Sequence, residues 1–520
     1  MNAQQWRQDR YPQELSAAVL GPRAPYRLGR LDRATAGYQP DVYSGDSASQ
    51  ASHDLMHRRT RDQRRNNPHI RKAVEALQDL IIGSGVQTLA DPFEPWMDLT
   101  GVTSADFDER LSYALESDEL FAEWWGDKKA FSADGRLDGM SFQRMVIGEC
   151  ATVGECFVLE SMRRVPRGSV GLCYQVIEAD CLDRAKNQQR TASSSRIVDG
   201  IELDADGREV AFWLFAEHPS DSYVVQGESK RYTADRCWHI MLPDRPTQHL
   251  GVTWLHASGQ PEIDRDQYVT AELATAKKAA ALSMVWKKKN PYGANLGLLS
   301  SESESDDDGN RQLRLGTSPV AAVIGEDEDV KIVESNRPNA GAAPFLKILD
   351  RYSASGIGLS YYTLTGDYES TNFSSVRAAK IDEDGHVRPL QMWFGSQIAL
   401  PIRKRFNAIA AALGMFATIT PEEFAANLRR YQRFEAMGPG RDLLDPDSET
   451  NAAISRLRAG LSTLKIECAK RGLHWVRVMR QAKLENQLAE ILGVKLDFSK
   501  GNGGQAAATN TRDQGATTSA

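Results

Sequence analysis

The 520-residue sequence has few cysteines and no long apolar segment. Its six cysteines include no Cys-x-x-Cys pair, which argues against a disulfide scaffold or a zinc knuckle. No stretch approaches about 18 uninterrupted apolar residues, so we expect no membrane-spanning helix. The opening residues, MNAQQWRQDR, lack the apolar core of a secretory signal peptide. We therefore expect reduced, buried thiols in a chain without a membrane segment.

The sequence motifs of common enzymes are also missing. There is no G-x-x-x-x-G-K-[ST] phosphate loop, no G-x-G-x-x-G after a strand, no H-E-x-x-H and no G-x-S-x-G. His53 and His57 have the i,i+4 spacing that zinc ligands can have, but no third ligand accompanies them in the sequence. A solvent-facing pair is the interpretation that the sequence favours. We predict a protein that is not an enzyme and needs neither a cofactor nor a metal.

Acidic residues slightly outnumber basic ones, with 70 Asp and Glu against 63 Lys and Arg, which gives a formal net charge of −7. Two acidic runs stand out, at residues 301–308 and 325–330. Two-metal nucleases use separated carboxylates, whereas contiguous acidic runs among Ser and Gly are typical of solvated loops. We expect loops here. The acidic residues of the first run are Glu302, Glu304, Asp306, Asp307 and Asp308.

The periodicity of the chain indicates an α+β protein. Short β-rich runs separated by turn residues such as Asp206-Gly207 lie between Gly171 and Ile240. Helical spacing dominates elsewhere, and Pro401 inside the longest helical tract predicts a bend. The expected segments are an extended arm (1–52), an α+β body (53–260), a long helix (261–289), an irregular insert (290–342), a second helix (343–358), a polar loop (359–372), a kinked helix (373–415), a connecting segment with a helical region (416–500) and a disordered tail (501–520).

Several stretches, in their order and spacing, resemble the lambda-type portal proteins of tailed bacteriophages over roughly residues 55 to 495. The most specific is LTGDYESTNFSSVRAA. The others are RRNNPHIRKAVEALQDLIIGSGV, GECFVLE with YQVIEADCLD, IELDADGREVAFWLFAEHPSD, and the ending from DLLDPDSETNAAISRL onward. The sequence departs from the family pattern at HASGQPEID and in the acidic insert near residue 304.

The resemblance implies a ring-forming subunit, usually in a dodecamer, around a DNA channel. It implies a mixed α/β wing (53–260), a two-helix stem (261–289 and 343–358), a small β-containing clip (290–342), a tunnel loop (359–372), a kinked wing helix (373–415) and a helical crown (416–500). The acidic residues of the insert would be clip contacts. The tunnel-loop residues facing the channel would be Thr365, Asp367, Tyr368, Glu369 and Asn372.

The implied partners are further copies of the chain, double-stranded DNA held without sequence specificity, the terminase large subunit, the major capsid protein or scaffold, and a head–tail connector. The implied location is the portal vertex of the virion capsid, after assembly in the host cytoplasm. A conduit should bind phosphate weakly, which suits the negative charge. The clusters Lys287–Lys289 and Arg403–Arg405 are consistent either with rings of positive charge around the axis or with inter-subunit ion pairs or helix C-terminal charges.

Two alternatives remain at this point. One is another head-associated structural or connector protein. The other, from a different class, is a metal-dependent DNA-processing enzyme that uses the acidic runs with magnesium.

Overall fold

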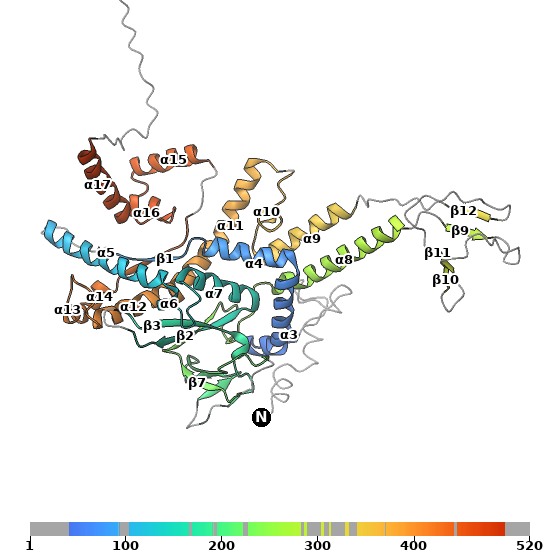
Figure 1. Cartoon of the computed structure of the whole chain (residues 1–520), viewed down its shortest axis with the longest axis horizontal. Coiled ribbons are helices and arrows are strands. Elements are labelled where there is room, and N and C mark those ends of the chain that lie inside the picture. Colours follow the sequence, from blue (N-terminus) through green and yellow to red (C-terminus); the bar gives the residue numbers. More distant parts are fainter. Residues whose placement is uncertain are drawn as a thin grey trace, which may run out of the picture. The chain divides into compact units, whose positions relative to one another are not determined.

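The computed structural model describes residues 41–493, with gaps at 92, 94–102, 166–168, 190, 192–194, 222–226, 282–284, 289–302, 306–310, 314–327, 332–340, 370 and 441–444. The chain divides into two compact units, each built from several separate segments of the sequence. Unit 1 is Met1–Arg71, Glu149–Leu159 and Val176–Ile357, and unit 2 is Lys72–Gly148, Glu160–Gln175 and Gly358–Ala520. Figure 1 shows the elements in chain order.

Unit 1 opens with helix α3 (Gly45–Asn66), which starts well before His53. Residues 45–52 were expected to belong to an extended arm because they carry no apolar period. The helix starts here because the side chain of Ser44 caps it by accepting from the N–H of Ser47. The carboxylate of Asp46, in the first turn, also accepts from the backbone N–H of His249 at 2.8 Å. Polar contacts therefore hold this end of α3.

The β-structure of unit 1 is antiparallel. Strand β2 (Glu155–Met162) pairs with β8 (Cys237–Met241), and a separate sheet has the strand order β4-β5-β6-β7. Its strands are Arg196–Val198, Ile201–Leu203, Glu209–Leu214 and Lys230–Thr233. Phe157, Ile201 and Leu214 are fully buried in one apolar cluster against this sheet. These strands confirm the predicted mixture of helix and sheet.

Two helices and four short strands complete unit 1. Helix α8 (His256–Ala281) and helix α9 (Ala342–Ile357) pack against each other. The chain between them contains β9 (Val285–Lys288), β10 (Ser303–Ser305), β11 (Arg311–Leu313) and β12 (Glu328–Lys331), paired as β9 with β12 and β10 with β11.

The expectation of one continuous helix from 261 to 289 was wrong at its C-terminal end. Residues 285–288 form strand β9, in which Lys287 lies opposite Asp329 and Lys288 opposite Glu328 of β12. The Ala-rich text with high helix propensity ends at Ala281, whereas Val285 and Trp286 are β-favouring residues. A paired strand of opposite charge therefore replaces the last helical turns.

Unit 2 is mainly helical. Helix α4 (Pro68–Ile81) enters it from unit 1, α7 (Gly139–Val153) leaves it, and β2 and β3 (Leu172–Glu178) also cross the division. Its other elements are β1 (Gln87–Ala90), α5 (Ser104–Gly126), α6 (Lys128–Phe131), α10 (Tyr361–Thr365), α11 (Phe373–Phe394), α12 (Leu400–Ala412), α13 (Pro421–Ala426), α14 (Leu428–Tyr431), β13 (Phe434–Met437), α15 (Pro446–Arg458), α16 (Leu464–Ala469) and α17 (Trp475–Leu492). The side chain of Asp445 caps α15 by accepting from the N–H of Ser448.

Pro401 lies at the start of α12, directly after a π-helical segment that covers Gly395–Ala399. In this segment the N–H of Leu400 donates to the carbonyl of Gly395, five residues back. A proline inside a helix lacks an N–H and its ring collides with the carbonyl four residues earlier. The wider π turn accommodates that ring without ending the helix, and such turns are a recognised cause of bends. A second proline, Pro389, lies inside α11 and was not singled out from the sequence.

The core of unit 2 is aromatic. Phe121, Trp124, Phe131 and Phe406 are buried and meet ring to ring, with centroid distances of 4.8 Å for Trp124–Phe406 and 5.0 Å for Trp124–Phe131. Edge-to-face and tilted pairs of this kind add stability beyond the area that they bury.

The six cysteines are free and buried, as expected from the sequence. No helix in the described part of the chain is both long and apolar enough to span a membrane.

Candidate functional site

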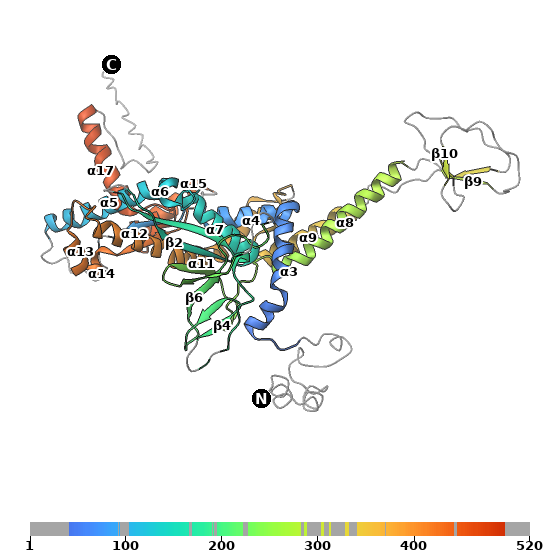
Figure 2. The same ribbon diagram turned by 60° about the horizontal axis from the view of Figure 1, so that its bottom comes forward.

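The two helices α8 and α9 form an antiparallel hairpin in unit 1, seen side by side in Figures 1 and 2. The hydroxyl of Ser258, early in α8, donates to the carbonyl of Ser353, late in α9, at 2.8 Å. A Cβ added to Gly356 would lie only 2.3 Å from the Ser258 hydroxyl, so glycine is required for this close approach. Farther along, the Tyr268 and Phe345 rings meet edge to face at 5.1 Å.

Charged groups fix the base of this hairpin. Nε of Arg265 donates to the Asp350 carboxylate at 2.6 Å. Nδ1 of His69 lies 3.7 Å from carboxylate oxygens of both Asp350 and Glu262. Glu262 is fully buried, which alone would raise its pKa, but the neighbouring His69, Ser353 and Arg265 together lower the pKa. The hydrogen bonds of Ser258 and Arg265 therefore hold α8 and α9 to each other, and His69, near the start of α4, lies close to the base of both.

Each helix of the hairpin leaves an apolar stripe exposed. On α9, Phe345, Ile348 and Tyr352 are 44%, 61% and 66% exposed and follow i, i+3, i+7 spacing. On α8, Val269 and Leu273 are 37% and 53% exposed, one turn apart. Grouped apolar side chains on a surface mark interaction sites more often than scattered ones do. This exposed surface was not predicted from the sequence, although the spacing of the apolar residues on α9 is visible there.

The segment 359–372 was expected to be a polar, exposed loop with few apolar anchors, which the structure corrects in part. It contains the short helix α10, which begins after the capping side chain of Ser360 and ends at Gly366 with φ of 73°. Leu359 and Leu364 are buried, at 6% and 2% exposed. Two leucines are thus enough to hold a short capped turn against unit 2.

The five predicted residues of this segment play different structural parts. The Tyr361 hydroxyl donates to the Asp367 carboxylate at 2.7 Å, and the Thr365 hydroxyl donates to the Tyr361 carbonyl. Asn372 caps α11 by accepting from the N–H of Ser375. The ring of Tyr368 is stacked on that of Tyr362 at 5.8 Å. Tyr368, Glu369 and Asn372 are exposed, whereas Thr365 and Asp367 are half-buried in the turn.

Of the predicted clip residues, Glu304 lies in β10, opposite Gln312 of β11. The other four, Glu302 and Asp306–Asp308, lie outside the described residues.

Two of the three basic residues at 403–405 are engaged within unit 2. Nη2 of Arg403, a fully buried residue, donates to Asp118 at 2.8 Å and to Ser117 at 2.7 Å. The carbon of its guanidinium group lies 4.4 Å from the centre of the Phe121 ring, a cation–π contact. Burial lowers the pKa of Arg403 to about 10, which still leaves it charged at neutral pH. Arg405 pairs with Glu160 at 2.8 Å. Arg403 and Arg405 thus form ion pairs within one chain, which is neither of the interpretations drawn from the sequence.

His53 and His57 are not a solvent-facing pair, which corrects the prediction. They are 2% and 3% exposed, and the carboxylate of Glu155, a fully buried residue of β2, lies 3.1 Å from Nε2 of His53. This partner could not be predicted from local sequence, because it lies 102 residues farther along the chain.

The chain is similar to portal proteins of known phages. Its residues 31–391 match the family described as "Phage portal protein, lambda family". It is 25% identical over 442 residues to the probable portal protein of Halomonas phage phiHAP-1, covering 84% of this chain and 80% of that protein. It is also 25% identical over 185 residues to portal protein B of Escherichia phage lambda, covering 35% of this chain and 34% of that protein.

Two solved structures also align with the chain, at lower sequence identity. A chain in the structure titled "Neck of empty GTA particle computed with C6 symmetry" aligns with a TM-score of 0.40 and 14% identity, covering 84% of this chain and 94% of that one. A chain in the "Virion of native gene transfer agent (GTA) particle" aligns with a TM-score of 0.39 and 14% identity, covering 89% and 98%.

The family match extends over more than half of the chain, from the helices that precede β1 to the end of α11. The prediction of the family from sequence is thereby confirmed, and with it the prediction that the protein is structural rather than enzymatic. The chain belongs to the lambda family of phage portal proteins and is a structural component of the virion head, at its portal.

Proposed function

We propose that copies of the chain close into a ring, a dodecamer as in the family, at one vertex of the capsid. Double-stranded DNA passes through the channel of this ring during packaging and ejection. Family membership supports this proposal, and the observation that carries it is the pair of exposed apolar stripes on α8 and α9.

A two-helix hairpin cannot bury apolar residues on its outer sides by itself. Ile348 and Tyr352 on α9 and Leu273 on α8 remain more than half exposed in the single chain. In a closed ring with head-to-tail interfaces, every hairpin has one neighbour on each side, so both stripes are covered without leaving a free end. The occupant we assign to these stripes is therefore the hairpin of the next subunit.

The other parts of the chain are assigned the regions of a portal subunit in such a ring. The hairpin forms the stem, and the segment between its helices, with strands β9–β12, is the clip that docks the terminase large subunit and later the head–tail connector. The residues 359–372 form the tunnel loop. The body at 53–260 and the helices of 373–415 form the wing, and 416–500 the crown, with the major capsid protein or scaffold as a further partner.

The charge distribution supports a conduit that does not hold DNA tightly. Each phosphate contact made by Lys or Arg adds salt-dependent affinity through counterion release, so a sliding duplex needs few of them. The arginines at 265, 403 and 405 are engaged by carboxylates of the same chain. Asp264 and Asp266 are exposed on α8. The net charge of −7 agrees with weak, non-specific contact.

Electron microscopy of the purified full-length protein tests this proposal. We expect rings with a central hole wide enough for duplex DNA, and no cleavage of plasmid DNA when magnesium is added. Compact monomers at all protein concentrations, or open filaments, would contradict the closed ring. Magnesium-dependent cleavage would instead favour a DNA-processing enzyme.

A further inference from the structure

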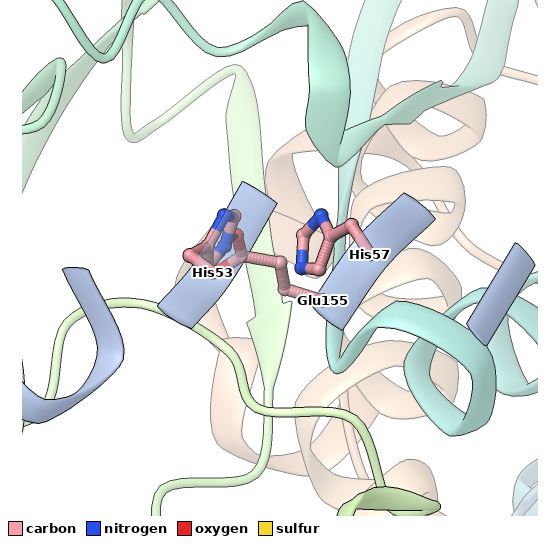
Figure 3. A group of neighbouring side chains, drawn as sticks. All are labelled: His53, His57 and Glu155. Carbon is pink, nitrogen blue, oxygen red and sulfur yellow. Dashed lines mark hydrogen bonds and ion pairs between the residues drawn. The ribbon is translucent and has the colours of Figure 1, made fainter. Parts of the chain in front are cut away.

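A cluster of two histidines and one glutamate lies buried between α3 and β2. His53 and His57 occupy successive turns of α3, and Figure 3 shows their rings side by side with the Glu155 side chain reaching toward His53. The ring centres are 3.7 Å apart. One ligand atom from each of the three residues lies within 4.8 Å of the other two. All three side chains are more than nine-tenths buried.

One nitrogen in this cluster lacks a hydrogen-bond partner. Nε2 of His57 is buried, and no donor or acceptor among residues that the structure describes lies within hydrogen-bonding distance of it. Buried polar atoms are nearly always hydrogen-bonded, so an unsatisfied one calls for a cause.

We propose that His53, His57 and Glu155 bind one Zn²⁺ ion. Two imidazole nitrogens and a carboxylate oxygen are a ligand set that zinc accepts, with a fourth position left for water. Nε2 of His53 and Oε1 of Glu155 are 3.1 Å apart. Two ligands held at about 2.0–2.2 Å from one tetrahedral zinc ion lie roughly 3.3–3.6 Å apart, so these two atoms would separate by a few tenths of an ångström. The i,i+4 spacing brings the second imidazole to the same side of α3.

An outer shell already orients the carboxylate. Oε2 of Glu155, the oxygen that the proposed site does not use, accepts from Nε2 of His239 at 2.9 Å and from the N–H of Gly251. His239 is held in turn by Glu209, whose Oε1 lies 2.9 Å from its Nδ1. Second-layer contacts of this kind position metal ligands and raise affinity. Zinc on Oε1 leaves these contacts in place.

The hydrogen on His53 has to change position when zinc binds. In the structure as it stands, Nδ1 of His53 faces a guanidinium nitrogen of Arg184 at 3.0 Å, so the ring hydrogen is on Nε2, directed at Glu155. Zinc on Nε2 requires the hydrogen on Nδ1, with no net proton released. For Nδ1 to donate to the Asp54 carboxylate, whose Oδ1 lies 3.7 Å away and accepts from Arg184, the Arg184 side chain has to move.

The consequence is a clamp on α3. The ligands come from α3 and from β2, which are distant in sequence, so one ion would fix the helix to the β-structure of unit 1. A buried metal site of this kind stabilises the folded state by its own binding energy. The role inferred is therefore structural, in keeping with a portal protein.

The test uses full-length protein that has been stripped of metal with EDTA and dialysed. Titration calorimetry with ZnCl₂ should give one ion per chain, and zinc should raise the melting temperature. Addition of Co²⁺ should produce the intense visible absorption of a tetrahedral site. His57→Ala should abolish all three effects. His256→Ala, which removes an exposed histidine of α8, is the matched control and should leave them unchanged.

Three results would overturn the proposal. These are no stoichiometric zinc binding by the wild type, wild-type binding without the tetrahedral cobalt spectrum, and binding retained after His57→Ala. Because alanine could loosen α3, His57→Gln is measured in parallel, with circular dichroism to check folding. If both variants unfold, the cobalt spectrum of the wild type tests the proposal: tetrahedral absorption supports it, and the lack of that absorption contradicts it.

Discussion

The hairpin of unit 1 exposes apolar side chains, whereas the region around Arg403 in unit 2 buries a charged one. Arg403 is a charge with no exposed surface, held by Ser117 and Asp118 and covered by aromatic rings, all from the same unit. The hairpin exposes aliphatic and aromatic side chains that a single chain cannot cover. The first region makes its contacts within its own unit and should govern stability. The second is incomplete without a partner and should govern assembly.

The largest effect is expected at Asp118. Its carboxylate receives Arg403 at 2.8 Å and Arg477 at 3.0 Å, so Asp118→Ala leaves a buried guanidinium without its counter-charge. Breaking a buried pair from one side usually costs about 3–5 kcal/mol. We expect the free energy of unfolding in urea to fall by that amount. Glu119→Ala, at the exposed neighbouring position, should change it by less than about 0.5 kcal/mol. Similar small losses for both variants would show that the centre is not a stability determinant.

The base of the hairpin should show an intermediate effect. Asp350→Ala removes the carboxylate that accepts from Arg265 at 2.6 Å, in a setting where both side chains are mostly buried. We expect a loss of about 1–3 kcal/mol, the cost of leaving one buried partner unsatisfied. Hydrogen exchange should rise in α9 and spare α12. Faster exchange in both helices would show that the stability of the hairpin and the stability of the Arg403 region are coupled.

Two acidic residues of the segment 359–372 allow its local structure and its proposed role in the channel to be tested separately. Asp367 holds the α10 turn through Tyr361, whereas Glu369 is exposed and donates its backbone N–H to Asp367. Glu369→Lys should therefore leave stability and ring assembly unchanged. If the segment lines the channel, the added basic groups should slow DNA packaging most at low salt, because phosphate contacts weaken as salt rises.

Asp367→Lys, with or without Glu369→Lys, should additionally lower the melting temperature, since it breaks the turn. Packaging that is normal for Glu369→Lys at every salt concentration would remove this segment from the channel.

The smallest effect is expected at the start of α3. The hydrogen bond and the charge of Asp46 raise the pKa of the partly exposed His249. A raised folded-state pKa stabilises the fold below the unfolded value of about 6.5 and loses that contribution as pH rises through the folded value. In Asp46→Asn the His249 pKa, followed by NMR, should fall toward its ordinary range. An unchanged titration would show that the pairing is absent in solution.

The sequence predicted the elements whose evidence is local. The turn at Asp206-Gly207, which lies between β5 and β6, and the burial of the six cysteines follow from neighbouring residues. The portal family was likewise recognisable from the order of short motifs.

What escaped prediction depends on distant partners. Arg403 pairs with Asp118, 285 residues away, and His53 meets Glu155, 102 residues away. Residues 285–288 follow an Ala-rich helix but pair with β12 instead of extending it. Short-range periodicity carries no information about such contacts, because they form only when the fold brings remote segments together.

The claim that neighbouring subunits cover the hairpin's apolar stripe is tested most directly by the mass of the assembled particle, measured with the stripe intact and with it disrupted. Ile348→Glu places a charge at an exposed apolar position of α9, and Gln267→Glu places the same charge at an exposed polar position of α8. Native mass spectrometry should find rings for the wild type and for Gln267→Glu, and folded monomers with an unchanged melting temperature for Ile348→Glu. Intact rings from Ile348→Glu, or monomers from all three proteins, would contradict the claim that neighbouring subunits cover this surface.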